Sequence, residues 1–160
     1  WPGVASLDIV GNVIPFIGGE EEKVEQETRK ILAAPIVVSA HTNRVPVIDG
    51  HTETVSVGFS RPVSPEEASE VLAAFRAPPN VAKLPSTPET PVIVETRPDR
   101  PQPRLDLERG GGMSVTVGRI RPCPLLHLRF VLLSHNTVRG AAGATIQNAE
   151  LLVSEGVVAR

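Results

Sequence analysis

Proline is concentrated in one stretch of the chain, and this concentration limits the regular structure that can form there. Eight of the 26 residues from position 78 to position 103 are proline. Because proline fixes its own φ and has no N–H to donate, it interrupts helices and the central strands of sheets. We predict that residues 78–103 form an extended connection with one short strand, Val92–Glu95, and not a hinge between two folded domains. Helices and longer strands must lie on either side of it.

Three segments have the pattern of helices. Residues 20–32 are dense in Glu, Lys and Arg and carry an apolar stripe, which is typical of a mostly exposed amphipathic helix. Residues 64–67, Ser-Pro-Glu-Glu, offer Ser as a helix cap, Pro at the first position and Glu at the third. A second helix should therefore begin there and end near Arg76. An Ala-rich helix should begin at about Arg139.

The strongest turn signal in the chain is the dipeptide Asp49-Gly50. Apolar residues alternate with polar ones from residue 55 to residue 59, which is the pattern of a strand. The segment around the turn is therefore predicted to be a β-hairpin. Such a hairpin would allow Arg44 and His51 to approach the same place, where a cation and a titratable base could handle an acidic substrate.

The remaining segments favour an α+β fold. Residues 36–40, 113–120 and 125–133 have the apolar character of strands. Only five residues of the chain are aromatic, so the core must rely on Val, Leu, Ile and Ala, which suits a sheet with helices packed on it. We predict a mixed, largely antiparallel sheet with helices packed on it.

Composition makes several classes of partner unexpected. The chain has 18 acidic and 16 basic residues, a net charge of -2, and no basic stripe with aromatic residues, so nucleic acid is not expected. Apolar runs such as residues 125–133 are much shorter than the ~20 residues that span a bilayer. One cysteine and four scattered histidines suggest neither an internal disulfide nor a metal site. The sequence thus predicts a cytoplasmic, metal-free protein without a membrane partner.

Several blocks of the sequence together carry a family resemblance. They are residues 12–32, Arg44-Val-Pro-Val, Gly50-His51, Arg121-Pro-Cys-Pro, residues 134–143 (Ser-His-Asn-Thr-Val-Arg-Gly-Ala-Ala-Gly) and residues 148–152. In this order and spacing, over about half of its residues, the chain closely resembles the carboxyl-terminal part of aspartate-semialdehyde dehydrogenases, notably the archaeal and fungal branch. One departure is Gly11, which stands where the family usually has an Asp.

The resemblance implies a domain organisation. Residues 1–160 would be a single partial domain, namely the catalytic and dimerisation domain with a C-terminal helix. No Gly-x-Gly-x-x-Gly follows an apolar strand, so the N-terminal nucleotide-binding domain of the family is expected to be absent. The match starts part-way into the second domain, which predicts uncovered sheet edges and association as a homodimer or homotetramer.

The resemblance also implies a reaction. These enzymes reductively dephosphorylate 4-phosphoaspartate to aspartate 4-semialdehyde with NADPH, in the pathway to lysine, threonine, methionine and isoleucine. A cysteine thiolate forms a thioester with the substrate, and a histidine acts as general base. The resemblance maps this histidine onto His51. It implies NADP as the cofactor, bound mainly by the nucleotide-binding domain.

Three charged residues map onto positions that bind the substrate in the resembled enzymes. Arg44 is implied to grip the α-carboxylate, a task that suits a planar guanidinium. Glu20 is implied to hold the amino group, and Lys23, one helical turn later, to contact the phosphate. Glu21 and Glu22 leave the register open by one residue, and a weak surface pair between Glu20 and Lys23 is the alternative.

The start of the last helix is implied to lie near the nicotinamide. Asn136 and Gly140 are therefore the candidate cofactor contacts. The sequence itself offers Asn136 or Thr137 as the cap of this helix, and Gly140 and Gly143 as points of close backbone approach. Close packing of the helix, without cofactor contact, is an equally open interpretation.

Cys123, the single cysteine, is not expected to be the nucleophile. The resembled enzymes carry their nucleophile in an Asn-Cys-x-Thr turn, which this sequence lacks. Only Arg121 is expected to lower the pKa of the Cys123 thiol, whereas an active thiolate usually needs stronger stabilisation. The isolated chain is therefore predicted to be inactive.

Two other functions remain open. The chain could belong to a related acyl-phosphate or aldehyde reductase that acts on another acidic substrate, although the set of Glu20, Lys23 and Arg44 favours an amino acid. It could also be a non-catalytic oligomerisation module, because sheet edges and apolar faces can serve subunit contacts alone.

Overall fold

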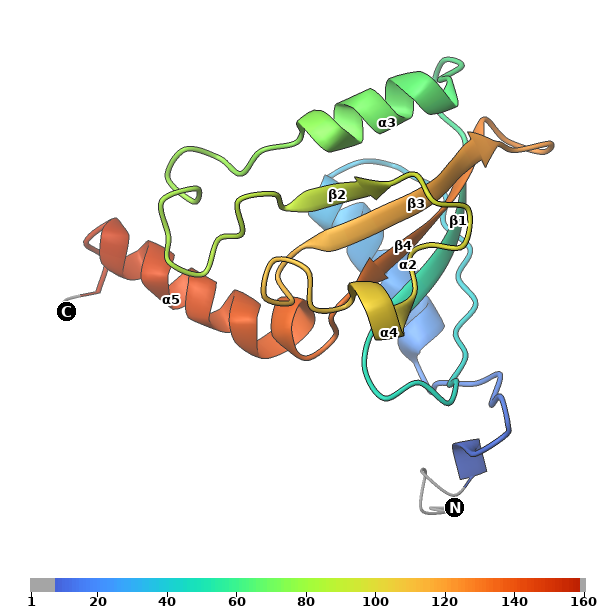
Figure 1. Ribbon diagram of the computed structural model, residues 1–160, viewed down its shortest axis with the longest axis horizontal. Coiled ribbons are helices and arrows are strands. Elements are labelled where there is room, and N and C mark those ends of the chain that lie inside the picture. Colours follow the sequence, from blue (N-terminus) through green and yellow to red (C-terminus); the bar gives the residue numbers. More distant parts are fainter. Residues whose placement is uncertain (1–7, 159–160) are drawn as a thin grey trace. The chain divides into compact units, whose positions relative to one another are not determined.

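The computed structural model describes residues 8–158 of the chain. By its internal contacts the chain divides into two compact units, Trp1–Ile48 and Asp49–Arg160. The first unit holds one long helix, and the second holds a four-stranded sheet and the remaining labelled helices (Figure 1).

Helix α2, Glu20–Leu32, is the main element of the first unit, as the sequence predicts. Its first turn is acidic and its last turn carries Arg29 and Lys30, so the charges at both ends complement the helix dipole. No residue of α2 is buried, and Ile31 is 77% exposed. The prediction of a mostly exposed amphipathic helix is confirmed.

Side chains of α2 hold the segment that follows it. The Glu25 carboxylate accepts the Ala40 N–H at 3.0 Å, and the Glu21 carboxylate accepts the Thr42 N–H at 2.8 Å. The predicted strand at residues 36–40 is wrong, because the backbone here bonds to helix side chains and to the preceding turn instead of a neighbouring strand.

Four strands form the sheet of the second unit. They are β1 (His51–Val57), β2 (Val92–Glu95), β3 (Val115–Pro122) and β4 (Leu128–Ser134). Their order is β1-β4-β3-β2, in which β2 and β3 run parallel and the other neighbours antiparallel. The prediction of an α+β fold with a mixed, largely antiparallel sheet is confirmed.

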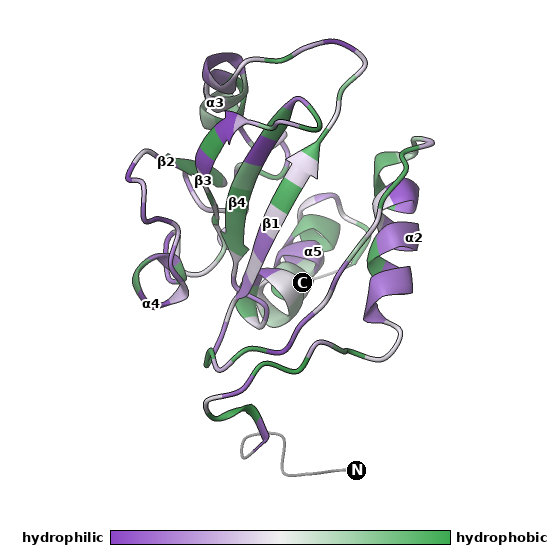
Figure 2. Cartoon of the chain, turned by 90° about the vertical axis from the view of Figure 1, so that its right-hand side faces the viewer, coloured by the Kyte–Doolittle hydropathy of each residue, from purple (hydrophilic) through white to green (hydrophobic). Residues whose placement is uncertain are grey.

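The predicted hairpin across Asp49-Gly50 is wrong, although a strand does follow the turn. β1 pairs with β4 along its whole length, with His51 opposite Ser134. Residues 45–50 form no strand, and Pro46 has no N–H for a ladder. β4 is hydrophobic over much of its length (Figure 2) and gains from burial between two neighbours, so it takes β1 as its partner.

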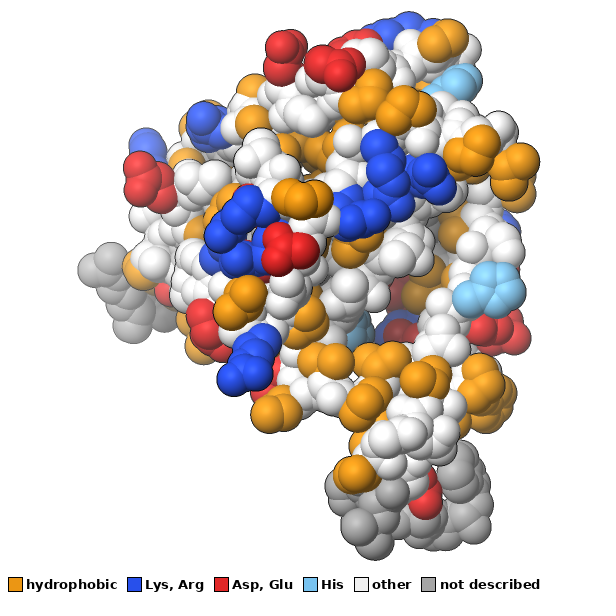
Figure 3. All heavy atoms as spheres, turned by 45° about the vertical axis from the view of Figure 1, so that its right-hand side comes forward, with side chains coloured by type: hydrophobic (Ala, Val, Ile, Leu, Met, Phe, Trp, Pro, Cys, Tyr) orange, Lys and Arg blue, Asp and Glu red, His pale blue; other side chains and the backbone are white. Residues whose placement is uncertain are grey.

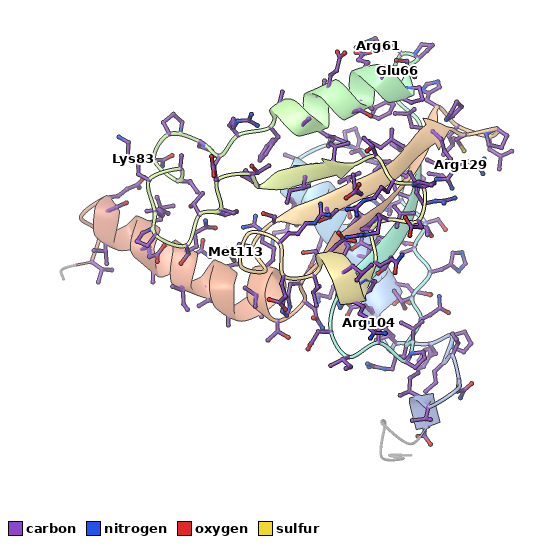
Figure 4. The ribbon with its side chains drawn as sticks, in the orientation of Figure 1. Arg61, Glu66, Lys83, Arg104, Met113 and Arg129 are labelled. Atoms are coloured by element: carbon purple, nitrogen blue, oxygen red, sulfur yellow. The ribbon has the colours of Figure 1, made fainter. Side chains whose placement is uncertain are left out.

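Helix α3, Pro65–Ala74, packs on β2 and β3 (Figure 1). The Ser64 hydroxyl accepts the Glu67 N–H at 3.1 Å, so the predicted cap is confirmed. The labelled side chains of Arg61 and Glu66 lie near this end of the helix (Figure 4). Within residues 8–158, the buried apolar residues are Leu84, Met113, Val117, Leu128 and Leu133. Most of them belong to β3 and β4 or adjoin these strands, so the core is centred on the middle of the sheet.

A buried ion-pair network anchors the proline-rich connection, which holds β2 and a short helix, α4 (Pro103–Asp106). Arg100 Nε donates to Asp106 Oδ2 at 2.5 Å, and Arg109 Nη2 lies 2.7 Å from Asp106 Oδ1 and 2.8 Å from Glu95 Oε2. The Arg100 guanidinium, with the Gln102 N–H, holds the pKa of the Asp106 carboxyl below its usual value. The predicted connection with one strand is confirmed, and the structure adds a helical turn.

The last helix begins as a π turn, Val138–Ala142, and continues as α5, Gly143–Ser154, close to the predicted start at Arg139. A Cβ at position 143 would lie 2.6 Å from Met113 Sδ and 2.8 Å from the Val138 carbonyl oxygen. The first turn of α5 therefore lies against the loop before β3, where Met113 is labelled in Figure 4.

Further along, α5 is bonded to the proline-rich connection. The Glu150 carboxylate accepts both the N–H and the hydroxyl of Ser86, at 3.0 Å and 2.8 Å. Gln147 Nε2 donates to Thr87 Oγ1 at 2.7 Å. No residue of α5 is buried, and these polar contacts help to fasten the helix within the second unit.

Candidate functional site

His51 is the first residue of β1 and pairs with Ser134, the last residue of β4. Its side chain is exposed. The preceding Gly50 has φ 107°, and a Cβ there would lie 2.8 Å from Leu107 Cδ1 and 3.2 Å from Leu133 Cδ1. Only glycine fits such a conformation and such close neighbours. The Gly-His pair thus sets the His51 backbone at one point at the end of the sheet.

Asn136 lies beside this turn. Its Oδ1 accepts the Gly50 N–H at 2.9 Å, so the structure brings a predicted cofactor contact next to the predicted base. Thr137 Oγ1 lies 3.5 Å from the Asp49 carboxylate. The prediction that Asn136 or Thr137 caps the last helix is wrong, because neither side chain bonds to that helix and both reach the turn before β1 instead.

His135 takes the capping role. Its Nδ1 accepts the Thr137 N–H at 3.3 Å and the Val138 N–H at 3.4 Å. This assigns the imidazole hydrogen to Nε2, which faces the Glu108 carboxylate at 3.6 Å. The residue is only 7% exposed. The sequence analysis missed the capping role of His135. A single His before a helix carries no motif that would show whether its side chain is a buried acceptor or lies on the surface.

Gly140, the second predicted cofactor contact, lies in the π turn. Its N–H donates to the His135 carbonyl at 2.9 Å, and a Cβ at position 140 would lie 3.7 Å from the same oxygen, which is an ordinary contact. Of the two glycines expected to permit close approach, only Gly143 does so, because a Cβ at position 143 would clash with Met113 Sδ.

In the first unit, Glu20 and Lys23 lie one turn apart at the start of α2, with Glu20 Oε1 3.5 Å from Lys23 Nζ. Glu21 is the alternative in the predicted register, but its carboxylate accepts the Thr42 N–H. That bond favours Glu20 as the carboxylate that is available to a ligand. The Glu20–Lys23 pair is also the weak surface pair that the sequence left as an alternative.

Arg44 lies in the same unit on a single antiparallel bridge with Ile14, whose N–H and carbonyl bond to those of Arg44 at 3.0 Å and 2.9 Å. Arg44 is exposed, and within residues 8–48 its guanidinium makes no ion pair. The backbone is therefore fixed while the side chain can reach an anion.

The predicted residues thus form two groups, one in each unit. The first unit carries the charged residues Glu20, Lys23 and Arg44, which suit a substrate with an ammonium and two anionic ends. The second unit carries His51 with Asn136 and Gly140. This group suits proton transfer beside a polar ligand.

Cys123 lies in the turn between β3 and β4 and is half-buried. The N–H groups of Leu125 and Leu126 lower the pKa of its thiol, with smaller help from Ser56 and Arg129. The expectation that Arg121 alone would lower this pKa is therefore wrong. A tight turn can present several backbone N–H groups to one sulfur, which sequence spacing does not reveal.

The position of Cys123 separates it from the predicted base. Its N–H donates to the His127 carbonyl, just before β4 begins, whereas His51 pairs with Ser134 at the other end of that strand. Six steps along a strand correspond to about 20 Å. Cys123 and His51 therefore do not form a nucleophile–base pair within the second unit.

Among residues 8–158, no group of three or more His, Cys, Asp or Glu side chains is arranged to hold a metal ion. In the same part of the chain, no helix combines the length and the apolar character that crossing a membrane requires.

Residues 1–139 match the family described as semialdehyde dehydrogenase, dimerisation domain. The chain belongs to this family. The resemblance that the sequence motifs indicate is therefore confirmed, and with it the expectation of a dehydrogenase dimerisation domain.

Curated relatives of this dimerisation domain agree. The chain is 54% identical to the aspartate-semialdehyde dehydrogenase of Archaeoglobus fulgidus and 48% identical to that of Schizosaccharomyces pombe, with 99% of the chain covered in both cases. It spans about half the length of these relatives, 48% of each.

Solved structures give the same result for the fold. The crystal structure of aspartate semialdehyde dehydrogenase with NADP from Candida albicans is 44% identical, has a TM-score of 0.88 and covers 98% of this chain and 48% of its own. Aspartate semialdehyde dehydrogenase II from Vibrio cholerae, complexed with ASA, is 31% identical with a TM-score of 0.75, over 91% of this chain and 42% of its own.

Proposed function

We propose that this chain forms the substrate-binding and general-base part of an aspartate-semialdehyde dehydrogenase. Such an enzyme reductively dephosphorylates 4-phosphoaspartate to aspartate 4-semialdehyde with NADPH, or runs the reverse reaction with phosphate. The observation that carries the proposal is the 54% identity to the Archaeoglobus fulgidus enzyme over 99% of the chain.

His51 is proposed as the general base. A neutral imidazole can take the proton of a thiol nucleophile and can manage the proton of the hemithioacetal hydroxyl. Its exposed side chain on a fixed Gly-His backbone supports this role. The nucleophilic thiol is proposed to come from outside this chain, because Cys123 lies at the other end of β4.

Arg44, Glu20 and Lys23 are proposed to bind the substrate. Arg44 would donate two hydrogen bonds to the α-carboxylate in a bidentate pair, which a planar guanidinium favours. Glu20 and Lys23, with Oε1 and Nζ 3.5 Å apart, would exchange their mutual contact for the substrate ammonium and the phosphate. An exposed pair of this kind is worth little by itself, so the exchange costs little.

NADP is proposed as the cofactor, since the similar Candida albicans structure holds it. When bound, it would supply the hydride in the reductive direction and accept it in the reverse. Asn136 and Gly140 are the proposed contacts from this chain. Asn136 Oδ1 is engaged by Gly50, whereas within residues 49–158 its Nδ2 makes no hydrogen bond and can donate to a carboxamide oxygen.

Association into a homodimer or homotetramer is proposed as well. The family is described by its dimerisation domain, and apolar side chains are spread over the face that Figure 3 shows. In the second unit Val71 is 65% exposed and Leu125 is 90% exposed. Uncovered apolar surface of this kind favours subunit contacts.

The proposal is tested with a chimeric enzyme in which this chain replaces the matching half of the Archaeoglobus fulgidus enzyme. Phosphate-dependent NADPH formation from aspartate 4-semialdehyde is expected in the chimera and absent from the isolated chain. The substrate panel should include the semialdehyde that is longer by one CH₂. Its kcat/KM should be at least 10-fold lower than that of aspartate 4-semialdehyde, in line with the usual discrimination of one methylene. Equal turnover of both semialdehydes would indicate a reductase for another acidic substrate.

A further inference from the structure

The residue before the proposed base is tied to the start of the last helix. The Gly50 N–H donates to Asn136 Oδ1 at 2.9 Å, across 86 positions of sequence. β1 begins its pairing at His51, so the Gly50 N–H lies outside the ladder with β4. Backbone donors need a partner, and Asn136 supplies it. The Asn136 side chain therefore helps to set the path of the backbone into His51.

Asn136 is itself held by the residue before it. His135 Nδ1 accepts the N–H groups of Thr137 and Val138, and the His135 carbonyl accepts the Gly140 N–H. The imidazole has little room to move, since it is 7% exposed and a Cβ at position 112 would lie 2.9 Å from its Cδ2. A buried ring thus fixes the backbone that presents Asn136.

The His51 imidazole has no comparable restraint. Within residues 49–158 no hydrogen bond or ion pair reaches its side chain, which is exposed. The backbone at Gly50 and His51 therefore sets the point from which the imidazole extends. A shift of about 1 Å in a reacting group can cost about 10²-fold in rate. Whatever fixes Gly50 is thus in a position to affect proton transfer.

We propose that Asn136 is a positioning residue for the general base His51, and that His135 positions Asn136 in turn. The contact of Thr137 Oγ1 with the Asp49 carboxylate, 3.5 Å long, is a second and weaker tie between the same two segments. The assignment rests on the proposed function for the role of His51. The tie between Asn136 and Gly50 is a property of the second unit and can be tested by itself.

The first test uses nuclear magnetic resonance on the 160-residue chain. Asn136→Ala removes the acceptor, so the Gly50 amide should exchange with solvent at least 10-fold faster and the imidazole resonances of His51 should shift. Asn136→Asp keeps an oxygen acceptor and should preserve both signals. Asn148→Ala is the matched control, because Asn148 is an exposed residue of α5 in the same unit.

The result that overturns the proposal is equally direct. Unchanged Gly50 exchange and unchanged His51 resonances in a folded Asn136→Ala chain would mean that Asn136 does not position the base. If circular dichroism finds Asn136→Ala unfolded, His135→Gln takes its place, since a glutamine can bury an oxygen but cannot reproduce the Nδ1 acceptor geometry. His135→Gln should then loosen Gly50 and shift His51, and a variant without either effect rejects the proposal.

The second test measures turnover in the Archaeoglobus fulgidus chimera. Asn136→Ala should lower kcat by 10- to 100-fold and alter its pH profile, in addition to any rise in KM for NADP from the lost amide donor. Asn136→Asp keeps the oxygen acceptor and should recover most of the loss in kcat. A change in KM for NADP with kcat and its pH profile unchanged would leave Asn136 a cofactor contact only and contradict positioning. If His51→Asn leaves turnover intact, the proposed base fails, whereas the exchange result at Gly50 still stands.

Discussion

At the scale of single residues, the candidate site is defined by which polar groups are already engaged. The Glu21 carboxylate accepts the Thr42 N–H, whereas among residues 8–48 the Glu20 carboxylate makes one ion pair, with Lys23. Arg44 has a fixed backbone and an exposed guanidinium. Ligand binding in the first unit should therefore depend on Glu20, Lys23 and Arg44 more than on their charged neighbours.

Arg44→Lys should lower kcat/KM for aspartate 4-semialdehyde by about 10- to 100-fold in the chimera, because lysine keeps the charge but loses the bidentate geometry. Most of the change should appear in KM, since the carboxylate does not react. Steady-state kinetics measures it, with Arg29→Lys on α2 as the control. Equal kinetics for wild type and Arg44→Lys would remove Arg44 from the substrate site.

Sequence reasoning could find His51 but not His135. The glycine before His51 and the family motifs around it indicate His51 as the base. The positive φ of Gly50 is a local property, which a Gly in a turn already predicts. The capping role of His135 depends on burial beside Gly112 and on a turn whose N–H groups converge on Nδ1. Those features arise only after the chain folds.

At the scale of elements, local signals were sufficient for helices and insufficient for strand pairing. The Ser-Pro-Glu-Glu sequence determines the start of α3, because a cap bonds within three residues. β1 pairs with β4, which begins 71 positions after the end of β1 (128 minus 57), so this pairing depends on contacts that are distant in sequence. Residues 36–40 have the sequence pattern of a strand, but the Ala40 N–H donates to the Glu25 carboxylate and not to a neighbouring strand.

Gly143→Ala should destabilise the second unit by about 1–3 kcal/mol, because the added Cβ meets Met113 Sδ at 2.6 Å and the Val138 carbonyl at 2.8 Å. Gly140→Ala is the matched control, since its Cβ would have 3.7 Å to the nearest atom and alanine favours helix. Urea denaturation compares the two variants. A Gly143→Ala chain as stable as Gly140→Ala would contradict the close approach of α5.

The proline-rich connection should be sensitive to acid. The pKa of Asp106 is lowered, chiefly by Arg100, so its charged form stabilises the fold. This contribution is present above the ordinary Asp value of 3.8 and is lost as pH falls through that value toward the folded-state pKa. Asp106→Asn should cost about 3 kcal/mol at pH 7, because it leaves Arg100 buried without its charge partner.

Urea denaturation at pH 7 and pH 3 measures this effect. The wild-type chain should lose more stability between the two values than Asp106→Asn does. Asp99→Asn is the control, since Asp99 is exposed and accepts from Gln102 Nε2 outside the buried network. Parallel losses in the wild type and Asp106→Asn would show that Asp106 does not carry the acid response.

At the scale of the whole molecule, the chain is a dehydrogenase dimerisation domain that spans 48% of its curated relatives. Its sheet leaves β1 and β2 as edge strands within the second unit. Edge strands and exposed apolar residues favour association. Light scattering after size exclusion should therefore give a mass near twice the 17.1 kDa of the chain, or four times. A strictly monomeric chain at 100 μM or so would contradict this expectation.

The most direct test of the account is the turnover of aspartate 4-semialdehyde, phosphate and NADP by the Archaeoglobus fulgidus chimera, with His51→Asn and Cys123→Ser side by side. The account predicts that His51→Asn lowers kcat by about 10²-fold or more, in the range of a lost general base, and that Cys123→Ser leaves it unchanged. Turnover that survives His51→Asn but disappears in Cys123→Ser would place the chemistry at the β3–β4 turn and contradict the account.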